Sequence, residues 1–182
     1  MLKKYDAENP ANKIPMTSRF IWSHPAHMLA SCFGVGGCSS APGTVGSVMA
    51  ALLYIVFAPS IPTKWWLVLA VVLFVAGIWA ASKVAADLGV EDHKGVVIDE
   101  FVAVLLLFAA LPQGPLWWIF GFIAFRFFDI YKLPPCDMID EKMKNGFGVM
   151  LDDIVAAFYA WIVVSCLGSV SYTHLRAHET SQ

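Results

Sequence analysis

The acidic residues of this chain are concentrated in two short clusters. Eleven of its fourteen carboxylates fall between Asp87 and Asp153, and uncharged, strongly apolar sequence separates the two groups. The members are Asp87, Glu91, Asp92, Asp99 and Glu100 in the first cluster, and Asp129, Asp137, Asp140, Glu141, Asp152 and Asp153 in the second. A charge in or beside hydrocarbon is costly unless it pairs, binds a metal or faces water. Acids at the ends of apolar helices therefore indicate a site for a hard cation.

Two of the acidic motifs share a pattern, in which two consecutive carboxylates precede an apolar run. Asp99 and Glu100 open one such run, and Asp152 and Asp153 open another. Consecutive residues point about 100° apart on a helix, so both members of a pair cannot comfortably face lipid. Two pairs on one face would offer the oxygen ligands that Mg²⁺ prefers, with water and a substrate phosphate completing its shell. Stabilisation of the helix dipole by acids in a first turn is the simpler alternative.

Basic residues near the second cluster suit a phosphate. Arg126, Asp129 and Lys132 recur every three residues along one helix face. Arginine can bind a phosphate through two parallel hydrogen bonds, whereas lysine acts as a point charge. An intrahelical salt bridge that faces water is the competing interpretation.

A glycine-rich segment, 34–47, precedes one of the apolar runs. Glycines let backbone N–H groups approach an anion, and a helix N-terminus adds free donors and a positive dipole end. Thr44 or Ser47 would cap that helix or bind phosphate. Taken alone, the segment is better explained as a plain helix-entry turn.

One histidine and the four cysteines are weaker candidates for a catalytic or metal-binding role. His93 is a candidate acid or base, but a solvated loop histidine is the favoured interpretation. The four cysteines, Cys32, Cys38, Cys136 and Cys166, have spacings that suit neither a zinc site nor a disulfide framework. We expect them to be reduced thiols without a role in the chemistry.

Composition points to a membrane protein or to a very apolar helical core. The chain is 58% hydrophobic and 14% charged, against about 25% charged in a typical soluble domain. The net charge of −2 leaves no basic footprint for nucleic acid. Apolar runs without period-two alternation predict helices over 45–57, 65–81, 101–111, 116–125 and 154–170. We therefore expect an all-α, compact bundle of about five apolar helices, embedded in a membrane, with the polar site loops on one face.

The order of these runs predicts how the site is assembled. If the five runs cross alternately, the glycine-rich segment and both acidic clusters lie on the same face. Ten of the twelve Lys and Arg residues also lie there, with Lys64 and Arg176 opposite, so this face is expected to be cytoplasmic. Several runs fall short of the roughly 20 residues of a full span. Tryptophans lie at the opposite helix ends, where an aromatic belt at the membrane interface and ordinary core packing explain their positions equally well. They are Trp65, Trp66, Trp117 and Trp118.

We divide the chain into three parts. Residues 1–22 form a polar N-terminal segment without the apolar core of a signal peptide. Residues 23–170 form a single helical domain. Residues 171–182 are a polar tail that resembles appended, non-native sequence.

Four motifs in fixed order resemble those of the phosphatidylglycerophosphatase A family. They are PGTVGS at 42–47, DLGVEDHKGVVIDEF at 87–101, FRFFDIYK at 125–132 and GFGVMLDDIVA at 146–156. The resemblance covers about 23–168. It implies an all-helical phosphatase of the bacterial inner membrane that depends on Mg²⁺. Such an enzyme converts phosphatidylglycerophosphate to phosphatidylglycerol in phospholipid biosynthesis.

The resemblance also implies roles for individual residues. The catalytic acids would be Asp99, Glu100, Asp129, Asp152 and Asp153, and the metal ligands among them Asp99, Glu100, Asp152 and Asp153. The substrate phosphate would be contacted by Arg126 and Lys132, with support from Gly43, Thr44 and Ser47. The chain departs from the family pattern at Ala103 and Ala157, where glycine is expected, and at Leu133, where a proline is shifted.

The mechanism expected from the residues is metal-assisted hydrolysis. The chain lacks the motifs of cysteinyl-phosphate and aspartyl-phosphate enzymes, so a metal would position water while one carboxylate acts as base. An aspartate nucleophile is the alternative. A head-group transferase is a rival enzyme, but its sequence motif is missing. A cation transporter would place its acids near mid-helix. A helical domain that only rests on the membrane would alter localisation more than chemistry.

Overall fold

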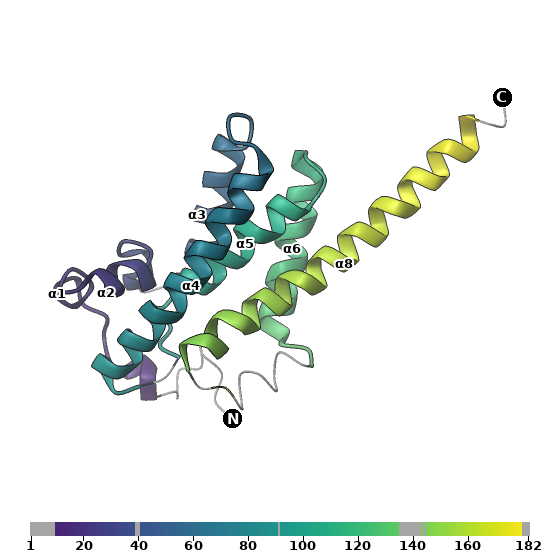
Figure 1. Cartoon of the computed structure of the whole chain (residues 1–182). Helices are drawn as coiled ribbons and strands as arrows, with labels where there is room; N and C mark the ends of the chain where they lie inside the picture. The colour runs from purple at the N-terminus through teal and green to yellow at the C-terminus, as the bar shows by residue number, and fades with distance from the viewer. Residues whose placement is uncertain (1–9, 39–40, 91, 135–142, 144, 180–182) are drawn as a thin grey trace.

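The computed structural model describes residues 10–38, 41–90, 92–134, 143 and 145–179, with side chains described as far as residue 168. Within these ranges all regular structure is helical, as the fold class predicted (Figure 1). The long helices are α3 (Pro42–Phe57), α4 (Thr63–Leu88), α5 (Ile98–Ala110), α6 (Pro115–Tyr131) and α8 (Gly146–Glu179). The short elements are η1 (Pro10–Lys13), α1 (Ser18–Ile21), α2 (Pro25–Ala30) and η2 (Val35–Gly37).

Each apolar run lies in one of the long helices, apart from the final residue of the run 101–111, which follows α5. Proline stands at the first position of α3 and α6, where its missing N–H costs nothing. Gly89 ends α4 in the left-handed conformation, with φ of 67°. The helices are longer than the runs because they include charged residues. Several of these charged residues, which the sequence placed at the helix ends, are buried within the bundle.

Helix α5 forms the centre of the bundle. Eleven of its thirteen residues are buried, and it packs against α3, α4, α6 and α8 (Figure 1). A helix that is apolar almost all round is stable only when its neighbours surround it. The two carboxylates in its first turn are therefore placed inside the protein.

Glycines bring α4 and α8 into close contact beside α5. A Cβ atom on Gly77 would lie 2.7 Å from the Met150 sulfur, and one on Gly146 would lie 2.3 Å from the Ile78 carbonyl oxygen. Small residues permit such approach of helix backbones. The contact fixes the first turns of α8, which carry Asp152 and Asp153, next to the start of α5.

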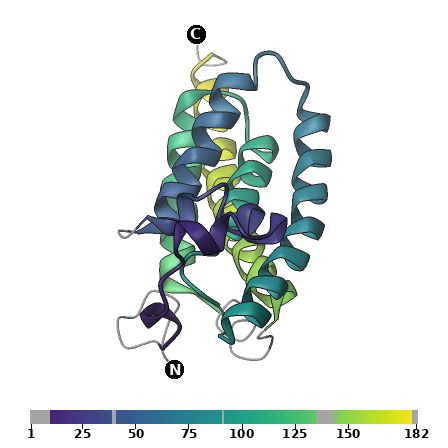
Figure 2. The same ribbon diagram turned by 90° about the vertical axis from the view of Figure 1, so that its left-hand side faces the viewer.

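The N-terminal segment crosses the outside of the bundle through α1 and α2, which were not predicted (Figure 2). Its polar composition suggested a separate region, yet Met16 and Ile21 are buried in the core. The Nε2 atom of His27 lies 2.8 Å from an Asp87 carboxylate oxygen, so a hydrogen bond joins α2 to α4. Asp87 also accepts a hydrogen bond from Lys83 at 2.6 Å. Asp87 thus helps to hold α2 against α4.

The outer faces of the long helices are apolar. Val71 on α4 and Ile123 on α6 are among many large hydrophobic side chains exposed there. Within the described part of the chain, two helices are long and apolar enough to cross a membrane, namely Thr63–Leu88 and Gly146–Gly168. Trp65 is 57% exposed and Trp66 is 2% exposed, so these neighbours divide between the surface and the core.

Helix α8 extends beyond the other helices at its C-terminal end (Figure 1). It continues to Glu179 and so includes most of the polar segment 171–182, for which the sequence suggested a separate tail.

Candidate active site

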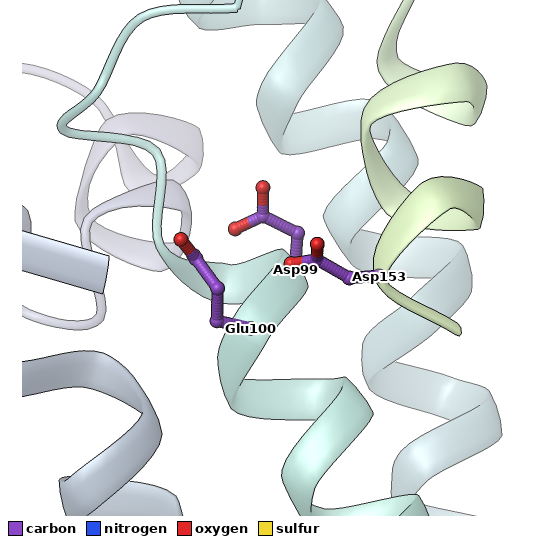
Figure 3. Close-up of side chains that lie close together, drawn as sticks. All are labelled: Asp99, Glu100 and Asp153. Carbon is purple, nitrogen blue, oxygen red and sulfur yellow. The ribbon is translucent and has the colours of Figure 1, made fainter. Parts of the chain in front are cut away.

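Three buried carboxylates converge where α5 meets α8 (Figure 3). Asp99 and Glu100 project from the first turn of α5, and Asp153 approaches from α8. One oxygen atom from each lies within 4.8 Å of the others. The three side chains are 2%, 1% and 5% exposed, respectively. The structure therefore brings together residues that are 54 positions apart in the sequence, on one side of the bundle.

The other two predicted acids lie beside this group. Asp129, near the end of α6, and Asp152 on α8 are also buried. Their charges act on Asp153, as do those of Asp99 and Glu100. Several negative charges in a low-dielectric interior repel one another strongly unless cations compensate them. All five acids predicted for the site thus belong to one buried cluster that calls for positive charge.

The donor set fits a hard divalent cation. Carboxylate oxygens are ligands that Mg²⁺ prefers, and Asp99, Glu100 and Asp153 supply them from two rigid helices. The Oδ2 atom of Asp153 is buried and finds no hydrogen-bond donor among the described residues. Such an atom is costly to bury unless an ion or a water occupies the space beside it. The structure thus brings together three of the four predicted metal ligands, and the fourth, Asp152, lies outside this group.

Arg126 links α6 to α3 at this site. Its Nη1 atom donates to Asp129 Oδ2 at 2.5 Å, and its Nη2 atom donates to Thr44 Oγ1 at 3.0 Å. A longer contact of 3.4 Å joins Nη1 to the buried Ser47 hydroxyl. The intrahelical salt bridge considered for this motif is present, but the prediction that it faces water was wrong. Only 14% of the Arg126 side chain and 7% of Asp129 are exposed, so the pair lies inside the protein and does not face water.

Lys132 links α6 to α8 in the same way. It follows the last residue of α6 in the left-handed conformation, with φ of 41°. Its ammonium group donates to Asp152 Oδ2 at 2.5 Å. The cluster is therefore flanked by two cations, one beside α3 and one beside α8.

The start of α3 differs from one alternative suggested by the sequence. Ala41 occupies the N-cap position, and among the described residues no side chain caps the helix. Thr44 and Ser47 lie inside α3, where the Ser47 hydroxyl donates to the Gly43 carbonyl at 2.9 Å. Thr44 accepts a hydrogen bond from Arg126, whereas the Gly43 carbonyl is linked to the site through the Ser47 hydroxyl.

The sequence favoured a solvated loop histidine at position 93, and this interpretation was wrong. His93 is 2% exposed, and each ring nitrogen makes a hydrogen bond with the backbone. The burial of His93 could not be predicted from a local sequence pattern, because one of its hydrogen-bond partners, Ile14, lies 79 residues away. The same contacts leave the ring poorly placed to act as an acid or base.

The cysteines within the described residues are free thiols. Cys32 is buried near the acidic cluster, while Cys38 and Cys166 are exposed. Burial, followed by the charges of Asp99 and Glu100, raises the pKa of the Cys32 thiol well above its ordinary range. A protonated thiol is a poor metal ligand. The remaining residues of the sequence-based analysis, which lie outside the described residues, are Glu91, Cys136, Asp137, Asp140 and Glu141.

Comparison with known proteins places the chain in a family. The family model described as Phosphatidylglycerophosphatase A matches residues 28–168. A phosphatidylglycerophosphatase A from Haemophilus influenzae is 42% identical over 157 residues, which cover 86% of this chain and 93% of the relative. The enzyme of that name from Escherichia coli is 34% identical over 148 residues, covering 81% and 86%.

A third relative carries a different name. This protein from Bacteroides thetaiotaomicron, provisionally named a phosphatidylinositol-3-phosphatase, is 38% identical over 145 residues, covering 76% of this chain and 90% of the relative. No solved structure gives a significant match. The matched region contains all the residues that form the acidic cluster and its two flanking cations. On the family model and these relatives, the chain belongs to the phosphatidylglycerophosphatase A family.

Proposed function

We propose that this protein is a Mg²⁺-dependent lipid phosphatase that hydrolyses phosphatidylglycerophosphate to phosphatidylglycerol and inorganic phosphate. Family membership supports the reaction class and the substrate. The observation that carries the proposal is the convergence of Asp99, Glu100 and Asp153 within 4.8 Å, between two cationic side chains. Production of phosphatidylglycerol gives the protein its place in phospholipid biosynthesis.

The two cations suit a phosphate even though each already holds an aspartate. Arg126 has five N–H donors and Lys132 has three. Each can therefore donate to a phosphate oxygen while keeping its contact with Asp129 or Asp152. Thr44 orients the guanidinium from α3. Together these groups would hold the dianionic phosphate against the carboxylates that bind the metal.

The residues that would hold the ion are Asp99, Glu100 and Asp153, with Asp152 close by. When bound, Mg²⁺ supplies charge neutralisation at the phosphate and lowers the pKa of water. One carboxylate of the cluster accepts a proton from the attacking water, whose oxygen forms the new bond to phosphorus. The bond from phosphorus to the glycerol oxygen breaks, and that oxygen takes up the proton. The products are the lipid alcohol and inorganic phosphate.

Phosphate release from the purified protein tests this function. We expect release from phosphatidylglycerophosphate that requires Mg²⁺, stops on chelation and returns when Mg²⁺ is restored. Phosphatidic acid, phosphatidylinositol 3-phosphate and a soluble phosphomonoester serve as comparison substrates, and we expect each to react more slowly. The inositol lipid is included because of the name of one relative.

Other outcomes separate the rival functions. Equal release in the presence of a chelator would contradict metal dependence. A head-group transferase would consume lipid without freeing phosphate, and a cation-binding protein without catalysis would bind Mg²⁺ and leave every substrate intact.

We further propose that the bundle is embedded in the bacterial inner membrane with the site facing the cytoplasm. Two helices of sufficient length and the apolar outer faces support embedding, and the distribution of Lys and Arg supports the orientation. The protein should stay in the membrane pellet after an alkaline carbonate wash. Release into the supernatant would instead indicate a protein that rests on the surface.

Cys38 provides a test of orientation. It is exposed and precedes α3 on the side of the site. A variant that keeps Cys38 and has alanine at the other three cysteines should react with a membrane-impermeant maleimide in inverted vesicles. Labelling in right-side-out vesicles alone would reverse the proposed orientation.

A further inference from the structure

The loop before α5 is held by the N-terminal segment at several points. The Val97 N–H donates to the Ala30 carbonyl at 2.9 Å, at the position that caps α5. A Cβ atom on Gly36 would lie 1.8 Å from the Gly95 carbonyl oxygen, so the two backbones are in direct contact. The loop 92–97 therefore depends on residues from the distant segment 14–36 for its path.

His93 makes the most specific of these connections. Its Nδ1 atom accepts a hydrogen bond from the Gly95 N–H at 2.9 Å, so this nitrogen carries no proton. The proton resides on Nε2, which donates to the Ile14 carbonyl at 2.8 Å. Val96 N–H in turn donates to the His93 carbonyl at 2.9 Å. The imidazole thus fixes a tight turn and joins it to the N-terminal segment.

The turn leads directly to two of the three carboxylates of the candidate metal site. Only Val97 and Ile98 separate the His93 turn from Asp99 and Glu100. Among the described residues no side chain caps α5 at Val97. The backbone that enters the first turn of α5 therefore helps to position it, together with the helices that surround it.

We propose that His93 is a positioning residue for the metal site. It acts through the Gly95 backbone to keep Asp99 and Glu100 at the distance from Asp153 that one cation requires. This inference rests on the proposed metal-dependent function. Partners of this kind, which orient metal ligands without touching the metal, typically change metal affinity or activity by about 10–100-fold when removed.

The test measures metal affinity directly, with Mn²⁺ as a spectroscopic substitute for Mg²⁺. Purified wild type and His93→Ala are titrated with Mn²⁺ and free ion is followed by electron paramagnetic resonance. We expect the affinity of His93→Ala to fall by at least about tenfold. The Mg²⁺ concentration for half-maximal phosphate release should rise in parallel, while kcat at saturating Mg²⁺ should change much less.

Two further variants separate the hydrogen bonds of the imidazole. In His93→Asn the amide oxygen can accept from Gly95 N–H, and in His93→Gln the amide nitrogen can donate to the Ile14 carbonyl. If the Gly95 contact positions α5, the asparagine variant should recover more Mn²⁺ affinity than the glutamine variant. Gln113→Ala is the control, because the Gln113 side chain also makes hydrogen bonds with two partners, in its case the Tyr54 hydroxyl and the Leu111 carbonyl.

The outcomes distinguish the inference from the function on which it rests. Wild-type Mn²⁺ affinity in His93→Ala would overturn the role of His93 alone. Equal losses of affinity in His93→Ala and Gln113→Ala, following equal losses of thermal stability, would also overturn it. A wild-type protein that binds no Mn²⁺ would overturn the proposed metal site and this inference together.

Discussion

Replacing Asp153 by asparagine is expected to abolish phosphate release while the helical bundle stays folded. The substitution keeps the shape of the side chain and removes one of the three carboxylates, those of Asp99, Glu100 and Asp153, that would bind the ion. Loss of a single group that stabilises a transition state costs about 10²–10³ in kcat. We expect at least the upper end of that range, because ion binding is weakened as well. Initial rates at saturating Mg²⁺ and circular dichroism in detergent provide the measurements.

The same substitution should stabilise the metal-free protein. Asp153 is buried among four other carboxylates whose charges act on it, and a neutral amide removes that repulsion. We therefore expect a higher Tm than that of wild type in the presence of chelator. Asp87→Asn is the control for the loss of one carboxylate, since Asp87 pairs with His27 and Lys83, and its activity should fall far less than that of Asp153→Asn. A fully active Asp153→Asn would rule out this site.

Replacing Arg126 by alanine is expected to have the second largest effect. The guanidinium holds Asp129 and Thr44 at once, and a phosphate would use its remaining donors. We expect kcat/KM to fall by about 10²-fold or more, as for other groups that stabilise developing charge. Arg126→Lys should recover only part of the loss, because an ammonium group cannot reproduce the planar fork. Steady-state rates over a range of substrate concentration measure both variants.

A comparison with Asp129→Asn shows whether Arg126 does more than hold its partner. If the ion pair alone matters, Arg126→Ala, Asp129→Asn and the double variant will lose equal activity. A phosphate contact predicts that Arg126→Ala raises KM more than Asp129→Asn does. Arg19→Ala, on the exposed surface of α1, should match wild type.

Much of the helical framework was predictable because its helices carry long apolar runs. The ends were placed less well, since a sequence pattern does not show that Asp99 or Asp129 is buried inside the bundle. The short helices α1 and α2 were missed because four and six residues carry too little periodicity. The packing of α2 on α4 includes the pairing of His27 with Asp87, 60 residues away, which no local pattern reveals.

The meeting of the acidic motifs followed from the alternate order of the apolar runs. The different contacts of Asp152 and Asp153 could not be predicted in this way, because they depend on the rotation of α8 about its axis. Neighbouring residues point about 100° apart on a helix. That rotation turns Asp152 toward Lys132 and Asp153 toward α5. Contacts of this kind arise from the assembled bundle and carry no local signature.

Both cations of the site are attached to the C-terminal end of α6: Arg126 lies in the helix and contacts Thr44 on α3, and Lys132 directly follows it and contacts Asp152 on α8. A substitution that changes the packing of α6 would therefore displace both cations together relative to the carboxylates of α5. Such a substitution, even far from the site, should resemble the loss of two positive charges and not of one.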